Sequence, residues 1–393
     1  MNQRDLFLRY LAQTSEAPLA LEFVKAEGSY LWDAEGKRYI DLIGGISVCN
    51  VGHRHHSVVA AIKDQVDRYL HTMVYGETVQ APQVGYARLL AEHLPASLNS
   101  VYFTNSGTEA VEGAMKLAKR ATGRTEVVAF KDAYHGSSQG ALSLMGDEYW
   151  RNAFRPLLPG VHQLRHNDFG DLARIGRDTA CVVLETIQGE AGVRVPEPAW
   201  IQALRARCDE TGALLVLDEI QCGFGRNGTL WAFTQFGIVP DVLLLGKALG
   251  GGMPLGAFIA DRPLMYELTY KPVLGHITTF GGHPVSCAAG MAAMRALLDE
   301  GMVEGVAERE AWFREALESL PGVKALRARG LMIALEFDSF ETNKRVIDRA
   351  ITAGVFTDWF LHNAQSMRIV PPLNISREDV QRACDILSLC ISS

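Results

Sequence analysis

The sequence predicts an α/β protein built around a large, mostly parallel sheet. Short apolar runs alternate with helical patterns through the middle of the chain, which is typical of a parallel sheet with helices on both faces. With 393 residues, 48% of them hydrophobic, the chain can bury a large core and form about two to three domains. An acidic pair ends one apolar run and a lysine ends another, so a polar site is expected at one edge of the sheet.

The strands of this sheet are predicted from apolar runs bounded by turn residues. Before them, Gly28–Ile40 is predicted to form a hairpin with Glu35-Gly36 in its turn. The predicted strands of the large sheet are Ser100–Thr104, Glu126–Phe130, Ala180–Glu185, Ala213–Leu217, Val242–Leu245 and Gly256–Ala260.

The end of the chain shows a different pattern. A helical pattern at Met291–Leu298 leads into a long helix, a strand at Leu331–Phe337 and a final helix from Ser376. We therefore expect a smaller α+β domain made of both chain ends, residues 1–50 and 290–393, beside a large domain of residues 51–289.

Composition excludes several classes of function. A net charge of −7 provides no basic stripe for nucleic acid. The amino terminus lacks the apolar core of a signal peptide, and no stretch approaches the roughly 20 apolar residues needed to span a bilayer. The seven cysteines are odd in number and form no Cys-x-x-Cys pair, which favours a reduced, cytoplasmic compartment.

Lys247 and Asp218 are the strongest candidates for chemistry. Lys247 follows the apolar run that begins after Asp241 and precedes a glycine-rich loop, and Asp218 ends the strand that begins at Ala213. The two residues lie 29 positions apart, about the length of a crossover between parallel strands, so both are expected at one sheet edge. A desolvated lysine can form a Schiff base with a carbonyl cofactor, although a solvated strand end is the simpler explanation for either residue alone.

Three further motifs accompany this pair. Ser106 and Glu109 have capping-box spacing at a helix start where Gly107 permits close approach, so a phosphate could bind there. Tyr134 follows another strand and could stack on a flat ring. Gln221 could donate to a phenolic oxygen. Each motif alone also fits an ordinary cap, a core aromatic or a solvated turn, but together they describe a pyridoxal 5'-phosphate site.

The order and spacing of these motifs resemble a known family. The chain resembles a class III, fold type I aminotransferase of the acetylornithine and ornithine aminotransferase subgroup, from about Gly28 to the last helix. The strings that carry the resemblance are Asn50–His53, Asn105–Ala110, Glu185–Glu190, Asp218–Gln221, Leu245–Gly252, Thr279–Gly282 and Met367–Pro372. The resemblance implies a large sheet of seven strands.

The resemblance also implies a role for each site residue. Lys247 is expected to be the Schiff-base lysine, and Asp218 the partner of the pyridine nitrogen. Gly107 and Thr108 would hold the phosphate, Tyr134 would stack on the ring and Gln221 would contact its phenolic oxygen. Thr279 resembles the threonine that reaches a phosphate in the neighbouring subunit, which implies a homodimer with shared active sites.

The expected substrate residues are Arg368 and Glu190. Arg368 resembles the arginine that clamps a substrate carboxylate, and Glu190 the glutamate that pairs with it until a 2-oxo acid, 2-oxoglutarate, is bound. The match fails at Ser137, where the acetylornithine and ornithine enzymes typically have an arginine for the distal carboxylate of the donor, and Ile46 stands at the position of a tyrosine in the ornithine enzyme. The donor is therefore predicted to differ from N-acetylornithine and ornithine.

Three alternatives stay open at this stage. An aminomutase of the glutamate-1-semialdehyde kind shares the Asn105–Ala110 string but needs no separate 2-oxo acid. A binding protein without catalysis could keep the same fold. Gly223–Gly228 matches the spacing of a dinucleotide motif, but Asn227-Gly228 signals a turn where a helix should begin.

The histidine-rich segment His53–His56 suggests a metal site. Adjacent side chains cannot all face one ion, however, so no metal site is predicted.

Overall fold

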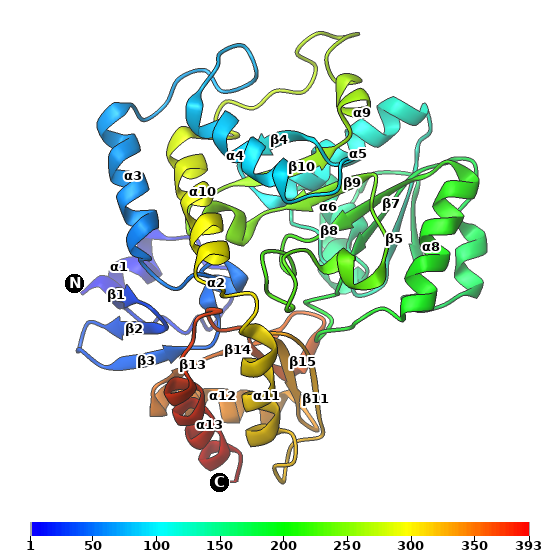
Figure 1. The fold of residues 1–393 in the computed structure, drawn as a ribbon. Helices are drawn as coiled ribbons and strands as arrows, with labels where there is room; N and C mark the ends of the chain where they lie inside the picture. The colour runs from blue at the N-terminus through cyan, green and yellow to red at the C-terminus, as the bar shows by residue number, and fades with distance from the viewer. Residues whose placement is uncertain (1, 393) are drawn as a thin grey trace.

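A seven-stranded sheet forms the centre of the larger part of the molecule, in a computed structural model that describes residues 2–392 (Figure 1). The strand order is β4-β10-β9-β8-β7-β5-β6. β10 is antiparallel to both neighbours, and the other pairs are parallel. The strands are β4 (Ser100–Thr104), β5 (Glu126–Phe130), β6 (Val161–Leu164), β7 (Thr179–Glu185), β8 (Leu214–Asp218), β9 (Val242–Leu245) and β10 (Gly256–Ala260).

This sheet confirms the predicted fold class and the six predicted strands, with shifts of one residue at β7 and β8. The sequence analysis missed β6. Only Leu164 of its four residues is buried, because β6 is an edge strand and its short sequence lacks an apolar run.

Both faces of the sheet are buried. Alternate residues of β8 belong to two separate hydrophobic clusters: Leu215 and Leu217 to one, Val216 to the other. Since successive side chains in a strand point to opposite faces, helices must cover both sides. Helices of 13 to 16 residues here include α3 (His56–Arg68), α5 (Gly107–Thr122), α8 (Pro198–Thr211) and α10 (Pro284–Asp299); shorter ones are α4 (Ala81–Glu92), α6 (Gln139–Leu144), α7 (Glu148–Arg151) and α9 (Arg262–Tyr266).

Both ends of the chain form the smaller part. Its sheets have the orders β1-β2-β3-β13 and β11-β12-β15-β14. β13 pairs in parallel with β3, which joins the two chain ends. The predicted domain division at residue 290 stays a proposal; it falls inside α10. The strands are β1 (Phe23–Glu27), β2 (Tyr30–Asp33), β3 (Arg38–Asp41), β11 (Ala325–Arg329), β12 (Met332–Glu336), β13 (Val355–Phe356), β14 (Asp358–Phe360) and β15 (Asn363–Ile369), with helices α1 (Gln3–Tyr10), α2 (Gly44–Ser47), α11 (Val306–Leu317), α12 (Phe340–Ala353) and α13 (Arg377–Ser392).

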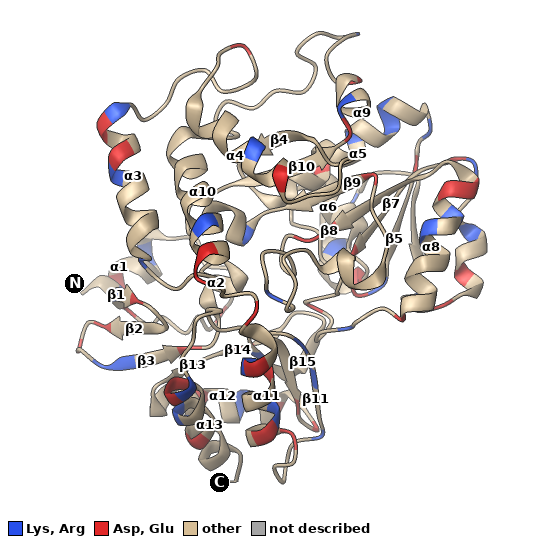
Figure 2. Cartoon of the chain, viewed as in Figure 1, with Lys and Arg blue, Asp and Glu red and all other residues tan. Residues whose placement is uncertain are grey.

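The surface features are ordinary. Figure 2 shows lysine and arginine interspersed with aspartate and glutamate on outer helices such as α8, α11 and α13. Within residues 2–392, none of the helices has the length and apolar character required to cross a bilayer.

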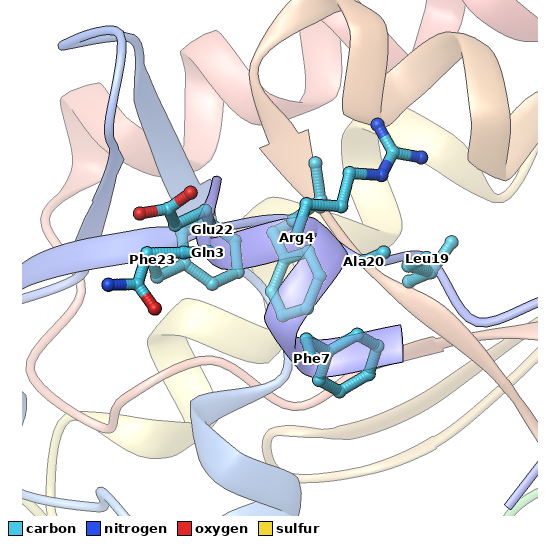
Figure 3. Close-up of a pocket in the computed structure, with 9 residues that line it drawn as sticks. Gln3, Arg4, Phe7, Leu19, Ala20, Glu22 and Phe23 are labelled. Atoms are coloured by element: carbon cyan, nitrogen blue, oxygen red, sulfur yellow. The ribbon is translucent and has the colours of Figure 1, made fainter. Parts of the chain in front are cut away.

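A cavity of about 420 Å³ lies beside α1, with Phe7 and Phe23 in its wall (Figure 3). It shares no lining residue with the cavity at Lys247.

Candidate active site

A cavity of about 320 Å³ lies at the carboxyl ends of β8 and β9. Asp218 is the last residue of β8, and Lys247 comes two residues after the end of β9. Ligands of parallel α/β sheets bind at this edge. The structure brings six of the predicted residues to this one cavity, namely Gly107, Thr108, Tyr134, Asp218, Gln221 and Lys247.

The backbone and surroundings of Lys247 are unusual. Its φ of 47° lies in the left-handed region, which costs a residue with a side chain about 1–3 kcal/mol and is common at functional sites. Burial lowers the pKa of the Lys247 amine, and the charge of nearby Glu190 opposes that shift. A lysine with a lowered pKa is more often neutral, and the neutral amine can act as a nucleophile or base.

Asp218 is held by two hydrogen-bond donors. Its Oδ1 accepts from the Ile220 backbone N–H at 2.9 Å, and its Oδ2 lies 2.8 Å from His135 Nδ1. Burial lowers the pKa of His135, but the Asp218 carboxylate outweighs burial and the net pKa is raised. The other nitrogen of His135, Nε2, is buried without a partner. The sequence analysis assigned His135 no role, and its only signal was its place beside Tyr134.

Glu185 connects two walls of the cavity. Its carboxylate accepts from the backbone N–H groups of Tyr134 at 3.0 Å and Gly189 at 2.9 Å. Burial raises the pKa of Glu185 to about 7. A Cβ on Gly189 would lie 1.8 Å from Gln221 Oε1, so any other residue at position 189 would displace the Gln221 side chain. The Nε2 of Gln221 is buried and has no partner among residues 2–392.

The first turn of α5 forms the opposite wall. Ser106 caps this helix by accepting from the Glu109 N–H, and the remaining N–H groups of a first turn are free to bind an anion. Gly136 has a φ of 124°, and a Cβ there would lie 2.4 Å from Thr108 Oγ1. Ser138 Oγ is 2.7 Å from the same Thr108 oxygen. The backbone is therefore packed closely enough to fix this turn.

Ser137 lies at the exposed side of the cavity. It lines the cavity, and its Oγ is 3.3 Å from the Tyr134 hydroxyl. Where an arginine would supply a charge, this position supplies only a short neutral hydroxyl.

Arg368 and Glu190 form a buried, two-pronged ion pair. Arg368 Nη1 donates to Glu190 Oε1 at 2.7 Å, and Nη2 donates to Oε2 at 2.9 Å. Both side chains are buried. Burial raises the pKa of Glu190, but the charge and hydrogen bonds of Arg368, the Lys247 charge and the Leu361 N–H together outweigh burial, and the net pKa is lowered. A second carboxylate, Asp358, lies 2.9 Å from Arg368 Nε. The sequence analysis missed Asp358, because a strand of three residues leaves no pattern.

Thr279 lies outside the cavity. It is exposed, and its carbonyl oxygen lies 2.8 Å from His71 Nε2.

In the histidine-rich segment, His53 pairs with Asp41 at 2.7 Å and His55 with Glu300 at 3.0 Å. Gly223–Gly228 is a turn rather than a helix start.

These residues fit pyridoxal 5'-phosphate. The cavity offers an amine for the aldehyde, a buried carboxylate for the ring nitrogen, an aromatic side chain and the first turn of a helix for the phosphate. The unpartnered Gln221 Nε2 is a buried donor that still lacks an acceptor, as expected where a ligand oxygen completes the site.

Known proteins match the chain over nearly its full length. The family model for class-III aminotransferases matches residues 10–391. An acetylornithine aminotransferase from Methanopyrus kandleri is 41% identical, covering 98% of this chain and 97% of the relative. A putrescine aminotransferase from Pectobacterium atrosepticum is 39% identical, covering 92% of this chain and 80% of that relative.

The fold comparison agrees. An ornithine aminotransferase structure from Toxoplasma gondii superposes with a TM-score of 0.91 at 30% identity, covering 99% of this chain and 93% of that one, and its title records pyridoxal phosphate at the active site. The chain is therefore a pyridoxal-phosphate-dependent enzyme and belongs to the class-III aminotransferase family.

Proposed function

We propose that this aminotransferase moves an amino group from a donor without an arginine-bound distal carboxylate to 2-oxoglutarate, in two alternating half-reactions. The observation that carries the proposal is the buried Arg368–Glu190 pair, at 2.7 and 2.9 Å, close enough for Glu190 to influence the pKa of Lys247. Such a pair lets one site accept both a neutral donor end and a carboxylate.

Each residue around the cavity would bind a different part of the cofactor. Lys247 would hold it covalently, Asp218 would bond to its ring nitrogen, and Tyr134 would stack on the ring. Gln221 would donate to the phenolic oxygen, and Gly107 and Thr108 would bind the phosphate at the α5 terminus. When bound, pyridoxal phosphate withdraws electrons from the donor carbon and carries the amino group between substrates.

Lys247 would also move the proton. Once the donor is bound, the freed Lys247 amine would accept a proton from the donor carbon and release it on the cofactor side. Its lowered pKa favours the neutral amine, the form that can accept that proton. His135, bonded to Asp218, would hold this carboxylate in the orientation that meets the ring nitrogen.

Arg368 and Glu190 would select between substrates. With a donor lacking a carboxylate near the reacting carbon, Glu190 neutralises Arg368. With 2-oxoglutarate, Glu190 moves aside and the planar fork of Arg368 binds the carboxylate in the same two-pronged way.

Ser137 sets the expectation for the donor. The short, neutral Ser137 hydroxyl cannot form the charge-assisted, two-pronged pair that an arginine makes with a carboxylate. A relative named putrescine aminotransferase is 39% identical, and putrescine carries no carboxylate. We propose a donor of that class, such as a diamine or another ω-amine.

A donor panel tests the proposal. The cofactor-loaded protein is mixed with putrescine, 4-aminobutyrate, ornithine or N-acetylornithine, and the absorbance of the lysine-bound cofactor is followed. We expect fast conversion with putrescine, which carries no carboxylate, and slow conversion with N-acetylornithine, whose free terminal amine is accompanied by a distal carboxylate. The matched variants are Ser137→Arg, expected to accelerate N-acetylornithine at least tenfold, and Ser137→Gln, expected to leave it unchanged. N-acetylornithine turnover by the unaltered protein at the rate of the best donor would contradict the proposal.

We also propose that the protein is a cytoplasmic homodimer. The segment that contains Thr279 carries four exposed apolar side chains, namely Val273, Leu274, Ile277 and Phe280, and exposed apolar patches commonly mark interfaces. The seven cysteines are all unpaired. Sedimentation should give twice the chain mass, and Ile277→Asp should shift the protein toward monomer and weaken phosphate binding by Thr279.

A further inference from the structure

The guanidinium of Arg368 has different partners on its two edges. On the Nη1/Nη2 edge, both nitrogens donate to Glu190, and Nη2 also donates to the Trp359 carbonyl at 2.9 Å. On the Nε edge, Asp358 Oδ1 lies 2.9 Å away. This second contact is an ion pair without the alignment of a hydrogen bond.

The two carboxylates come from different parts of the fold. Asp358 on β14 is the register partner of Arg368 on β15, so backbone pairing holds these two residues side by side. Glu190 lies in the segment after β7. Besides Arg368, the one donor to its carboxylate among residues 2–392 is the Leu361 N–H, at 3.1 Å. Asp358 therefore stays beside Arg368 whether or not Glu190 does.

A buried arginine left without a counter-ion is costly. Arg368 is 2% exposed, and removing one partner of a buried ion pair is strongly destabilising because it leaves a buried charge uncompensated. If Glu190 were its only counter-ion, moving Glu190 would leave the guanidinium uncompensated before a substrate carboxylate arrived. Asp358 supplies that compensation from the edge that the substrate does not use.

We propose that Asp358 is a positioning residue for the substrate carboxylate: it holds the Nε edge of Arg368 while the Nη1/Nη2 edge exchanges Glu190 for the ligand. This inference rests on the proposed function of Arg368 and names the residue that makes the exchange workable. The ring of Phe360, 4.8 Å from the guanidinium carbon, supports the face of the same group, so the fork keeps one plane during the exchange.

Binding of glutarate, a dicarboxylate without a reacting carbonyl, tests the proposal. Calorimetry on the cofactor-loaded protein should give a Kd for glutarate about tenfold higher in Asp358→Ala than in the unaltered protein, and about threefold higher in Asp358→Asn, which keeps an oxygen at the Nε edge. Asp348→Ala removes an exposed carboxylate of the same part of the fold, paired with Lys344, and should leave Kd unchanged.

The half-reaction with the acceptor shows whether the loss of Asp358 weakens substrate binding alone or impairs the enzyme in general. With the protein loaded with pyridoxamine phosphate, Asp358→Ala should raise the half-saturating 2-oxoglutarate concentration about tenfold and change the maximal rate less than twofold. An unchanged or lower Kd, or a maximal rate that falls while half-saturation stays the same, overturns the proposal. If Asp358→Ala does not fold, Asp358→Asn decides by the same criteria.

Arg368→Lys distinguishes the two levels of failure. If this variant binds glutarate as well as the unaltered protein does, the carboxylate role of Arg368 is wrong and the role of Asp358 falls with it. If Arg368→Lys weakens binding but Asp358→Ala does not, Arg368 keeps its proposed function and only the inference about Asp358 is overturned.

Discussion

At the scale of single residues, burial and a few short contacts decide which of the charged groups can do chemistry. Asp218 and Glu185 are both buried at the carboxyl edge of the sheet, one residue each at the end of a strand. Burial raises the pKa of Glu185 to about 7, whereas Asp218 contacts His135, whose pKa is raised. Two carboxylates at paired positions of neighbouring strands thus have different partners.

Asp218→Asn tests the proposed role of the acid at the ring nitrogen. The amide keeps the shape but cannot supply a charge, so we expect kcat to fall about 10²- to 10³-fold, the typical effect of removing one electrostatic contact to a transition state. Steady-state kinetics with the best donor measures the change. Asp209→Asn, at an exposed position on α8, is the control, and near-normal turnover by Asp218→Asn would argue against the assignment.

The buried His166 should account for part of the stability that the protein loses at acidic pH. Burial lowers the pKa of His166 from 6.5 to about 4. Between these two values the unfolded chain binds a proton that the folded chain does not, so stability is lost as pH falls from about 6.5 to about 4, by up to about 3 kcal/mol. Urea unfolding at several pH values should show a smaller acid loss in His166→Phe than in the unaltered protein. His162→Asn, at an exposed site, should lose as much stability at acidic pH as the unaltered protein does. The same loss of stability in all three proteins would contradict this prediction.

At the scale of elements, glycine at position 189 in the loop after β7 leaves space for the Gln221 side chain of the turn after β8. A Cβ there would meet Gln221 Oε1 at 1.8 Å, far inside van der Waals contact. The loop also carries Glu190, so one segment positions both the Gln221 side chain and the partner of Arg368.

Gly189→Ala should therefore act through Gln221. Displacing a site group by about 1 Å can cost up to about 10²-fold in rate, so we expect kcat/KM to fall between 10- and 100-fold. A double-mutant cycle provides the measurement: Gly189→Ala combined with Gln221→Ala should be little worse than Gln221→Ala alone. Additive losses would mean that the alanine disturbs something other than Gln221.

At the scale of the whole molecule, Arg226 ties three distant segments together. It lies in the turn that follows β8, is fully buried, and donates to the carbonyl oxygens of Leu331 and Pro371 and to the side chain of Asn50. Burial lowers the pKa of this arginine to about 9. The larger part of the molecule thus holds segments from both chain ends through one side chain.

Arg226→Met should destabilise the folded chain. Each buried carbonyl or amide oxygen left without a donor costs about 1–3 kcal/mol, so we expect unfolding to require at least about 2 kcal/mol less free energy. Urea denaturation measures the loss, with the exposed Arg177→Met as the control. A variant as stable as the control would show that other contacts, and not Arg226, hold the three segments.

The sequence by itself determined the strands with long apolar runs and the chemical groups at their ends. The runs before Asp218 and Lys247 predicted buried parallel strands, because a continuous apolar run and its length are local properties of a single segment. Neighbouring parallel strands must end at one edge, so the meeting of Asp218 and Lys247 followed from spacing. Together with the motifs at Gly107, Tyr134 and Gln221, these two residues predicted the cofactor, and the family resemblance then supplied the role of each residue.

Only the tertiary structure decided which polar groups compensate one another. His135 meets Asp218 across 83 positions of sequence, and Glu190 meets Arg368 across 178; such pairs depend on how the whole chain closes, and no local pattern encodes them. The resemblance proposed the second pair but gave no sign of Asp358, since a short strand such as β14 acquires its place by pairing with β15. Burial also changes what a carboxylate requires. On the surface it is solvated by water, but in the interior it must be paired or protonated.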